Sequence, residues 1–306
     1  MLLSPSSSPV QFFSRPSDLE ESQRLFHGRG HHFEGLEHVC IDWIAPALLV
    51  TFFAEPDPAW LKRLVNDLVS MFPEAKSIQV QYRCRKGAPF EVMFGEPLNQ
   101  LVAVEQGLKY HIALGKAQNT GLFLDMKNGR QWLRENSQGL NVLNLFSYTC
   151  GFSVAAIAGG AKQVVNVDMA KPALSTGREN HRLNDHDLAG VLFQGVDIFK
   201  SWGRIKKPGP YDILVSDPPS FQKGSVNIQR DYHKIISRIP QLVKPGGWVM
   251  LCLNSPDLDD AFLLGQVEEN CPECQLVQRI ENPEVFRDAQ EGKGLKVYLF
   301  KYLNAQ

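Results

Sequence analysis

The sequence contains no run of 18 apolar residues, so no segment is long and apolar enough to predict a membrane-spanning helix. Its opening, MLLSPSSSPVQFF, also lacks the basic start and long apolar core of a secretory signal peptide. No charge sign is in excess, because 32 Lys and Arg residues face 33 Asp and Glu residues. We therefore expect a cytoplasmic protein in which any polyanion site is a local patch.

Cysteine is scarce, with six residues scattered over 306. A chain of this length needs no disulfide staples, and the pattern is typical of reduced cytosolic thiols. The single C-x-x-C pair, Cys271-Pro-Glu-Cys274, has no second pair and no nearby histidine, whereas a structural zinc usually has four ligands. We predict no metal site.

What the sequence does have is ordinary globular composition, with 43% hydrophobic and 21% charged residues. We predict three parts, at residues 1–36, 37–110 and 111–306. The first part is polar and includes RLFHGRGHHFEG, which begins at Arg24. This arm is either a solvated loop or a segment that contacts phosphate.

Residues 37–110 have the pattern of a small α/β module. Residues 41–53 predict two apolar strands separated by Pro46. Asp57-Pro58 is typical of a helix start, and Pro73 ends the apolar stripe that follows. Residues 77–83 and 90–94 predict two more strands, so the expected order is strand, strand, helix, strand, strand.

After Tyr110 the pattern changes to alternating strands and helices, which predicts a doubly wound, mostly parallel sheet. The expected strands are residues 140–146, 163–169, 191–197, 211–217 and 248–254. The expected helices are residues 152–160, 170–184 and 229–244, the last one ending at KPGG. Residues 295–303 alternate and predict an antiparallel strand at the sheet edge.

In such sheets, ligands bind beyond the carboxyl ends of the strands. The turn from Asn144 to Gly151 follows the first strand, and Asp168 ends the second, where an acid accepts hydrogen bonds from a ribose diol. Asp197 ends the third strand and is placed to reach an adenine amine. These positions predict a cofactor that contains a nucleoside.

The glycines distinguish between such cofactors. A dinucleotide site needs G-x-G-x-x-G, but the turn after the first strand has one glycine, Gly151, and there is no P-loop motif. S-adenosylmethionine, which has ribose and adenine but no phosphate, fits better. Hydroxyl and backbone groups of Ser147, Tyr148 and Thr149 can form hydrogen bonds with the carboxylate and amine of its methionine part.

The segment Asp217-Pro-Pro-Ser-Phe221 ends the fourth strand. Its prolines stiffen the loop and leave carbonyls without competing N–H donors. Asp217 can accept from an exocyclic amine, and Phe221 can stack on a flipped base. The alternative is a rigid turn at the end of a buried strand.

Five motifs in a fixed order resemble one family. They are GLKYHIALGKAQNTGLFLDMKNGR (107–130), NLFSYTCGFSVAA (144–156), VNVDMAK (165–171), YDILVSDPPSF (211–221) and IQRDYHK (228–234). Together they resemble the class I S-adenosylmethionine-dependent methyltransferases that modify large-subunit ribosomal RNA, in which a small strand–strand–helix–strand–strand module precedes a Rossmann-like catalytic domain.

The resemblance implies S-adenosylmethionine as cofactor and RNA, such as 23S rRNA or its precursor, as partner, with monomer and homodimer both open. It also implies that the segment before the first strand packs beside the cofactor. The full set of expected cofactor-binding residues is Gln118, Thr120, Phe123, Asp125, Arg130, Asn144, Phe146, Ser147, Tyr148, Thr149, Gly151, Asp168, Met169, Asp197 and Asp217.

The sequence departs from the family at two places. Residues 1–38 are too short for the N-terminal PUA RNA-binding module of many relatives, so RNA docking would fall to the arm and the small module. Cys150 stands where many relatives have glycine.

The target base is predicted from the end of the fifth strand. Methylation of cytosine C5 needs a cysteine nucleophile, and its place in the cytosine-modifying members is Asn254 here, with Cys252 two residues earlier. The guanine-modifying branch has asparagine there. We predict direct transfer to a guanine nitrogen, with Asp217 and the Pro218 carbonyl orienting the base, Phe221 stacking on it and Asn254 holding an edge.

Several alternatives stay open. They are a cytosine-C5 enzyme that uses Cys252, a small-molecule methyltransferase, a non-catalytic RNA-binding protein and a dehydrogenase.

Overall fold

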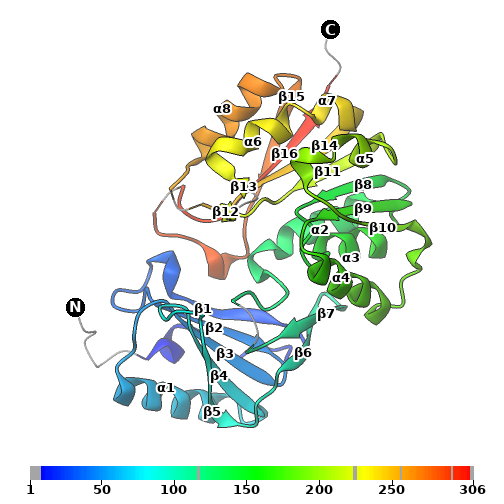
Figure 1. Ribbon diagram of the computed structural model, residues 1–306. Helices are drawn as coiled ribbons and strands as arrows, with labels where there is room; N and C mark the ends of the chain where they lie inside the picture. Colours follow the sequence, from blue (N-terminus) through cyan, green and yellow to red (C-terminus); the bar gives the residue numbers. More distant parts are fainter. Residues whose placement is uncertain (1–7, 116–117, 223–225, 256, 291, 304–306) are drawn as a thin grey trace. The chain divides into compact units, whose positions relative to one another are not determined.

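A computed structural model describes residues 8–115, 118–222, 226–255, 257–290 and 292–303; for Phe221 and Gln222 it describes the backbone alone. The chain forms two compact units (Figure 1). The first comprises Met1–Leu124 and Pro283–Gln290, and the second comprises Asp125–Asn282 and Glu291–Gln306. This division lies after the boundary expected at Tyr110, and the return of residues 283–290 to the first unit was not expected.

The first unit contains a five-stranded sheet, one long helix and a separate hairpin. Its elements are β1 (Gln23–His27), β2 (Val39–Ile44), β3 (Ala47–Phe52), α1 (Pro58–Met71), β4 (Ser77–Tyr82), β5 (Phe90–Gly95), β6 (Gln100–Glu105) and β7 (Leu108–Ala113), with short 3-10 turns η1 (Pro9–Phe12), η2 (Gly28–Gly30) and η6 (Glu284–Phe286). The strand order is β1-β2-β3-β4-β5, and β6 pairs with β7.

Helix α1 begins as its sequence predicts. The Asp57 side chain accepts a hydrogen bond from the Trp60 N–H at 2.8 Å, and Pro58 is the first helical residue. The apolar stripe of the helix, which includes Leu61, Leu64 and Leu68, is buried in the same core as the strands of the sheet. The expected order of strand, strand, helix, strand, strand therefore agrees with β2, β3, α1, β4 and β5.

Part of the N-terminal arm is not irregular, as expected, but forms strand β1. Arg24 in this strand makes an ion pair with the largely buried Asp42 of β2, so its charge is already neutralised. Burial and the nearby cations Arg24 and Arg29 lower the pKa of His27 to about 3. The run QRLFH is too short and too polar to predict a strand by itself.

The hairpin β6–β7 explains why the first unit extends beyond Tyr110. The Ser22 N–H donates to the Val104 carbonyl at 2.7 Å, and the Ala113 N–H donates to the Thr120 carbonyl at 2.8 Å. These bonds attach the hairpin and the turn that follows it to the first unit. No strand was expected over residues 100–113.

The second unit is built on a seven-stranded sheet. Its elements are α2 (Lys127–Asn136), β8 (Asn141–Leu145), α3 (Gly151–Ala158), β9 (Gln163–Asp168), α4 (Lys171–Leu183), η4 (Leu188–Gly190), β10 (Val191–Gly195), η5 (Ile198–Lys200), α5 (Trp202–Lys206), β11 (Tyr211–Ser216), β12 (Phe221–Gln222), β13 (Val226–Asn227), α6 (Ile228–Ile236), α7 (Ile239–Leu242), β14 (Val243–Leu253), α8 (Asp260–Asn270), β15 (Cys274–Ile280) and β16 (Lys296–Tyr302); η3 (Leu124–Met126) precedes α2.

The sheet order is β10-β9-β8-β11-β14-β16-β15, in which β10, β9, β8, β11 and β14 are parallel. This is the predicted doubly wound arrangement. Two expectations were wrong in detail. β16 is antiparallel but lies between β14 and β15, so β15 is the edge strand. Residues 229–244 form two helices, and β14 already begins at Val243, because Val243 pairs with Tyr211 before the irregular KPGG segment and pairing resumes at Trp248.

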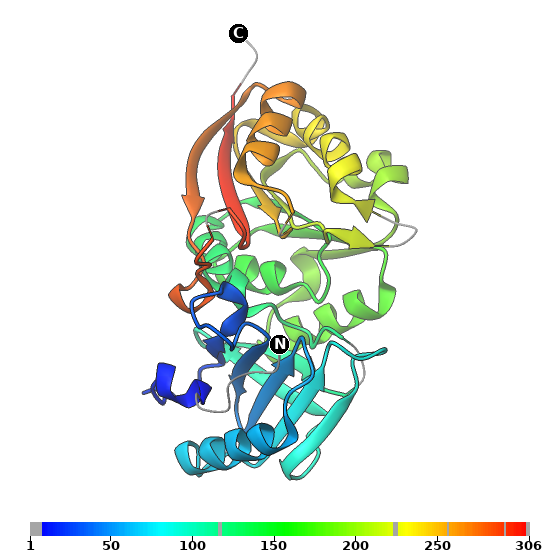
Figure 2. The ribbon, with the colours of Figure 1, turned by 90° about the vertical axis from the view of Figure 1, so that its left-hand side faces the viewer.

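Alternate residues of the strands pack on opposite faces of this sheet. Leu143 and Leu214 share a core with α6, α7 and α8, whereas Val142 and Ile213 share one with α2 and α3. Figures 1 and 2 show α6 beside α8. Helices on both faces account for the near-continuous apolar strands.

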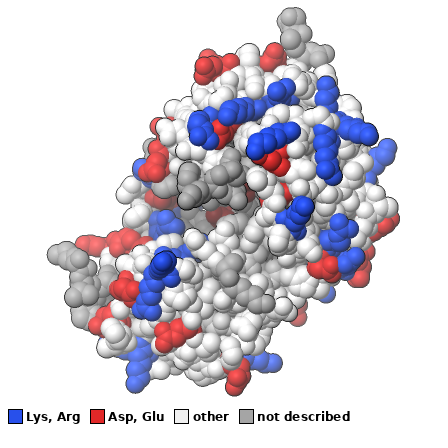
Figure 3. Space-filling view, in the orientation of Figure 1, with Lys and Arg blue, Asp and Glu red and all other residues white. Residues whose placement is uncertain are grey.

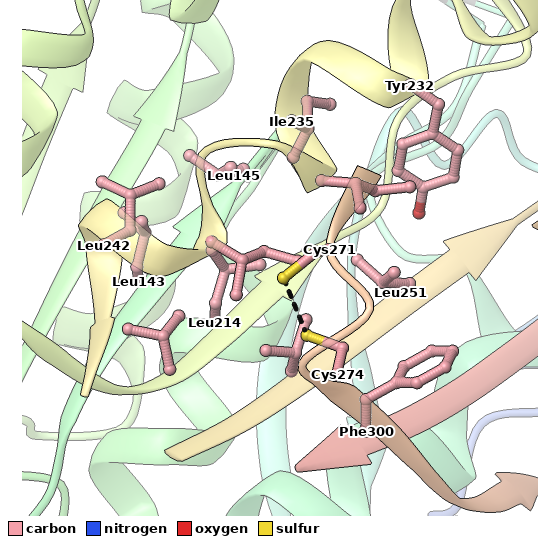
Figure 4. Close-up of a cluster of buried hydrophobic side chains, with 14 of the residues drawn as sticks. Leu143, Leu145, Leu214, Tyr232, Ile235, Leu242, Leu251, Cys271, Cys274 and Phe300 are labelled. Atoms are coloured by element: carbon pink, nitrogen blue, oxygen red, sulfur yellow. Dashed lines mark hydrogen bonds between the residues drawn. The ribbon is translucent and has the colours of Figure 1, made fainter. Parts of the chain in front are cut away.

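The C-x-x-C pair lies in the first of these cores. Cys271 ends α8, Cys274 begins β15, and both side chains are buried among Leu214, Leu251 and Phe300 (Figure 4). Their sulfur atoms are 3.5 Å apart and share a hydrogen bond. The pair therefore contributes to the packing of the sheet edge.

No helix formed by the described residues is long and apolar enough to cross a membrane. Over the same residues, His, Cys, Asp and Glu side chains do not gather in groups of three that could hold a metal ion.

Candidate active site

The strand order of the second unit reverses between β8 and β11, which creates the switch point at which ligands bind in such sheets. The two strands are parallel, with Val215 beside Asn144 and Ser216 beside Leu145. Their carboxyl ends therefore lie at the same edge, and the loops that follow them start next to each other. Six of the expected site residues belong to these loops, namely Phe146, Ser147, Tyr148, Thr149, Asp217 and Pro218.

The loop after β8 has an unusual backbone. Phe146, Tyr148 and Cys150 have φ angles of 55°, 47° and 62°, a left-handed conformation that non-glycine residues rarely adopt. Helix α4 supports this loop, because the Asn180 side chain donates to the Thr149 carbonyl at 2.9 Å. Such strain persists only where the surroundings hold it, and it is frequent at functional sites.

Contact with a glycine explains the cysteine in this loop. Cys150 is fully buried, and a Cβ atom built on Gly177 of α4 would lie 2.3 Å from its sulfur. The thiol therefore fills space that any larger residue at 177 would occupy. Cys150 adopts the left-handed conformation that glycine would adopt more easily, and its packing on α4 compensates for the strain.

The carboxylate of Asp168 is held in one orientation at the end of β9. Its Oδ2 accepts from the Tyr148 N–H at 2.8 Å, and its Oδ1 accepts from the Ala170 N–H at 2.7 Å. Each oxygen keeps a second lone pair for a ligand. Met169 follows with an exposed side chain, and Asp197, beyond the end of β10, caps η5 by accepting from the Phe199 N–H.

A chain of buried polar groups fixes Asn144. Its Nδ2 donates to Asn166 Oδ1, and Asn166 Nδ2 donates to Ser153 Oγ, both at 2.9 Å. Ser153 Oγ lies 2.9 Å from His181 Nε2, and the other ring nitrogen of His181 lies 3.1 Å from His186 Nδ1. Burial lowers the pKa of His181 to about 3, so this ring stays neutral. No sequence pattern pointed to these residues.

Three buried oxygen atoms near the switch point lack a partner among the described residues. They are Asn144 Oδ1, in β8, Ser147 Oγ, in the loop after β8, and Ser216 Oγ, in β11. Buried polar groups are nearly always hydrogen-bonded, so such atoms at a strand end suit a polar ligand or water. With the oriented carboxylate of Asp168, they fit the ribose and amino-acid groups of S-adenosylmethionine. Ser216 was not among the expected site residues, which begin at Asp217 in this segment.

Asp217 lies in a charged cluster at the end of β11. Burial and the neighbouring Asp125 carboxylate raise its pKa to about 7, while the buried Arg130 guanidinium opposes that rise. Asp125 and Arg130 come from the segment that the family resemblance implied, and the structure brings them close enough to Asp217 to interact electrostatically. The carboxyl group can therefore be protonated or ionised near neutral pH.

The loops after β11 and β14 are tied together. The Ser220 hydroxyl donates to the backbone carbonyl of Asn254, and the Tyr232 hydroxyl donates to the Cys252 carbonyl at 2.8 Å. Pro218 is buried and the Asn254 side chain is exposed. Phe221 begins β12, and its side chain lies outside the described residues.

Cys252 has a different environment from the one a nucleophile needs. Its side chain is fully buried on the α2–α3 face of the sheet, between β14 neighbours that belong to the core. Burial and the nearby Asp217 carboxyl raise the pKa of its thiol well above the ordinary value. The group is a core residue of β14.

Three of the expected cofactor residues belong to the first unit. The Gln118 carbonyl accepts from the Gln81 side chain at 3.0 Å, the Thr120 carbonyl accepts from Ala113, and the Phe123 side chain is exposed. Their backbone is thus held by the small module. The remaining expected residues belong to the second unit.

A family model described as S-adenosylmethionine-dependent methyltransferase matches residues 23–301. Among curated proteins, the chain is 31% identical over 273 residues to the ribosomal RNA large subunit methyltransferase I of Erwinia tasmaniensis, covering 85% of this chain and 68% of that protein. It is 32% identical over 244 residues to the protein of the same name from Aeromonas salmonicida, covering 76% of this chain and 61% of the relative.

Solved structures are similar over nearly the whole chain. A putative SAM-dependent methyltransferase from Streptococcus mutans is 27% identical, with a TM-score of 0.83, covering 93% of this chain and 76% of that one. A crystal structure of a putative methyltransferase complexed with SAH is 26% identical, with a TM-score of 0.84 and the same two coverages.

Proposed function

Because the chain belongs to the S-adenosylmethionine-dependent methyltransferase family, we propose that it transfers a methyl group to a guanine nitrogen of large-subunit ribosomal RNA. The RNA class is supported by the names of the curated relatives, of which the chain spans 61% to 68% in the two cases above. The partner would be 23S rRNA or its precursor.

The second unit offers groups for each part of the cofactor. We assign Asp168, which two backbone N–H groups orient, to the ribose hydroxyls, and Asp197 to the adenine amine. Ser147 and Thr149 are assigned to the amino-acid end. When bound, S-adenosylmethionine supplies an electrophilic methyl group on a positively charged sulfur.

The observation that carries direct transfer to nitrogen is the burial of the thiols. Attack on cytosine C6 needs an accessible thiolate, but the cysteines of the second unit are all buried. Burial raises the pKa of both Cys252 and Cys150. A guanine nitrogen attacks with its own lone pair, so the protein has only to position it.

Asp217 provides the group that orients the base. At a pKa of about 7 its carboxyl either accepts from the exocyclic amine of guanine or donates to a ring acceptor. Transfer to N7 releases no proton, whereas transfer to N2 releases one, which the ionised Asp217 can take. Pro218 offers its carbonyl to the base, Phe221 is assigned to stacking, and Asn254 to an edge contact.

The test uses methyl-deuterated S-adenosylmethionine and ribosomal RNA from cells that lack this protein. After digestion to nucleosides, mass spectrometry identifies the labelled nucleoside. We expect labelled guanosine, resolved as the N7 or N2 isomer. Labelled 5-methylcytidine would overturn the proposal in favour of a covalent route, and unlabelled RNA with intact cofactor binding would point to a small-molecule substrate.

A further inference from the structure

One segment of this nearly neutral protein is strongly basic. Residues 198–244 contain nine Lys and Arg residues but three Asp residues, whereas the whole chain has a net charge of −1. Figure 3 shows Lys and Arg side chains gathered over the part of the second unit that carries α5, α6 and α7. This is the kind of local patch on which polyanion binding by a neutral protein must depend.

The cations form a row over two aromatic rings. We define the cationic strip as Lys200 of η5, Arg204 of α5, Arg230 and Lys234 of α6, and Arg238 between α6 and α7. Because the last three are spaced four residues apart, they follow one side of the helix.

The rings beneath the strip are Phe199 and Trp202, whose centroids are 6.4 Å apart. Lys234 Nζ lies 5.8 Å from the Phe199 ring, and Arg238 Cζ lies 5.8 Å from the Trp202 ring. The strip is therefore one continuous surface across η5, α5 and α6.

This surface begins at the candidate site. The Phe146 ring, in the loop after β8, lies 6.4 Å from the Phe199 ring. η5 follows the cap residue Asp197, and α6 follows the short hairpin that starts at Phe221. A polymer lying along the strip would thus have one end close to the loops that are assigned to the cofactor and the base.

The charges of the strip are only partly neutralised. The buried Asp231 carboxylate accepts from Arg230 and Lys234, and Lys200 lies 3.2 Å from Asp197. In the part of the chain that the structure describes, Arg204 and Arg238 have no carboxylate within ion-pair distance. The five cations of the strip therefore outnumber the two carboxylates that pair with them.

We propose that the cationic strip binds the phosphate backbone of a single-stranded segment of the RNA substrate, next to the base that is methylated. This inference rests on the proposed function and adds to it the docking surface. A positively charged track beside an aromatic site is the general solution for single-stranded nucleic acid, whose phosphates are bound by Lys and Arg while a base enters the pocket. The guanidinium groups of Arg204 and Arg238 can exchange their solvent ions for phosphates.

The test compares two double variants. Arg204→Gln/Arg238→Gln removes the two cations of the strip that lack a carboxylate. Lys162→Gln/Arg182→Gln is the matched control, because it removes two exposed cations of the same unit, one before β9 and one near the end of α4. Binding of a fluorescein-labelled single-stranded RNA is measured by anisotropy between 50 and 300 mM KCl, a range of roughly sixfold in ionic strength.

For the strip variant we expect binding about tenfold weaker and a salt slope smaller by about 1.4, since each phosphate contact to single-stranded RNA contributes about 0.7. The control should stay within about twofold, because distant exposed charges are screened. Affinity for SAH should be unchanged in both, and the KM for RNA should rise in the strip variant with kcat retained.

Equal salt slopes in the two variants would overturn the proposal. So would competition by polyglutamate as effective as that by unlabelled RNA, since the strip would then be a general polyanion site. Failure of the proposed function gives a different result, namely wild-type protein that binds SAH but transfers no methyl group to RNA.

Discussion

Asp217 is the residue whose environment departs most from that of a carboxylate in water. Burial and Asp125 raise its pKa to about 7, so the folded protein keeps a proton that the unfolded chain releases near pH 4. This difference makes the stability of the fold depend on pH. Between about pH 4 and pH 7 the folded state binds more protons than the unfolded chain does, and its stability therefore decreases as the pH rises through this window.

We expect Asp217→Asn to remove this dependence. The unfolding free energy of the variant minus that of wild type should be a few kcal/mol larger at pH 8 than at pH 5. Each pKa unit corresponds to about 1.4 kcal/mol. Urea denaturation at both pH values measures it, with Asp257→Asn, an exposed carboxylate of the same unit, as control. The assignment fails if the difference between variant and wild type is the same at pH 5 and pH 8.

The same carboxyl group is assigned to orient the guanine base. We therefore expect Asp217→Ala to slow methyl transfer at least about 100-fold, as is typical when a positioned acid–base group is lost. Single-turnover transfer to RNA measures the rate. SAH affinity, measured alongside by calorimetry, separates loss of chemistry from loss of the cofactor. A variant with near wild-type transfer would remove Asp217 from the mechanism.

Asp168→Ala should act mainly on the cofactor. It removes the acceptor assigned to the ribose hydroxyls and leaves the Tyr148 and Ala170 N–H groups without their partner. Hydrogen bonds to charged groups contribute about 1.5–3 kcal/mol, so we expect SAH affinity to fall about 100-fold. Glu179→Ala, which removes a partly exposed carboxylate of α4, is the control. Calorimetric affinity within about twofold of wild type would rule the assignment out.

Substitution of Cys252 tests the alternative reaction, in which a cysteine nucleophile attacks cytosine. We expect Cys252→Ala to keep methyl transfer within about threefold of wild type, because the thiol is buried and protonated, and to lower stability by roughly 1 kcal/mol through the lost packing. Transfer assays and urea unfolding measure the two effects. Complete loss of transfer in a stably folded variant would instead indicate a nucleophile.

At the level of elements, the loop after β8 depends on its contact with α4. Gly177→Ala places a methyl group where the Cys150 sulfur lies, and overpacking of this kind costs about 1–3 kcal/mol despite the better helix propensity of alanine. Adding Cys150→Gly should restore most of the loss, because glycine frees the space and accepts the left-handed φ. Urea unfolding of wild type, the two single variants and the double variant gives the coupling free energy between positions 150 and 177. If the stability changes of the two single variants simply add in the double variant, the two residues are not in contact.

The elements that could be predicted from the sequence are those whose signals are local. Asp57 and Pro58 specify the start of α1, and the apolar strands β8, β9, β10 and β11 specify a parallel sheet. β1 and β15 were missed because their runs are short and polar, and pairing with a neighbouring strand stabilises them. The same limit applies to the start of β14, where Val243 pairs with Tyr211 ahead of the irregular KPGG segment.

The candidate site was predictable to the extent that it lies at strand ends. Asp168 and Asp217 follow apolar runs and could be found by position alone, whereas Asp125 and Arg130 came from the family resemblance. Asn166, Ser153 and His181 had no signal, because a hydrogen-bonded chain across two strands and two helices is a property of the fold. Buried oxygens without partners, such as Ser216 Oγ, are visible only in three dimensions.

At the scale of the whole molecule, the chain crosses between its units more than once. Residues 283–290 belong to the first unit, where the Phe286 ring lies 4.9 Å from the Arg24 guanidinium and 5.2 Å from the His27 ring. The Ala289 N–H donates to the Gly30 carbonyl at 2.7 Å. This short segment therefore covers β1 and the η2 turn.

We expect Phe286→Ala in the full chain to destabilise the first unit by about 3 kcal/mol, because the ring is buried. Hydrogen exchange followed by mass spectrometry should show the loss of protection in peptides from β1 and β2 while β8 and β9 keep theirs. Phe94→Ala, which truncates an exposed ring on β5, is the control and should change little. Equal loss of protection in both units would contradict the assignment of this segment.

The late return of residues 283–290 has a consequence for how the protein is made. A ribosome at typical speed needs on the order of ten seconds to pass from the end of the hairpin region to this segment. During that time β1 has emerged without the ring that covers Arg24 and His27. Although the N-terminal unit is translated first, it therefore reaches its final packing only when nearly all of the other unit has been synthesised.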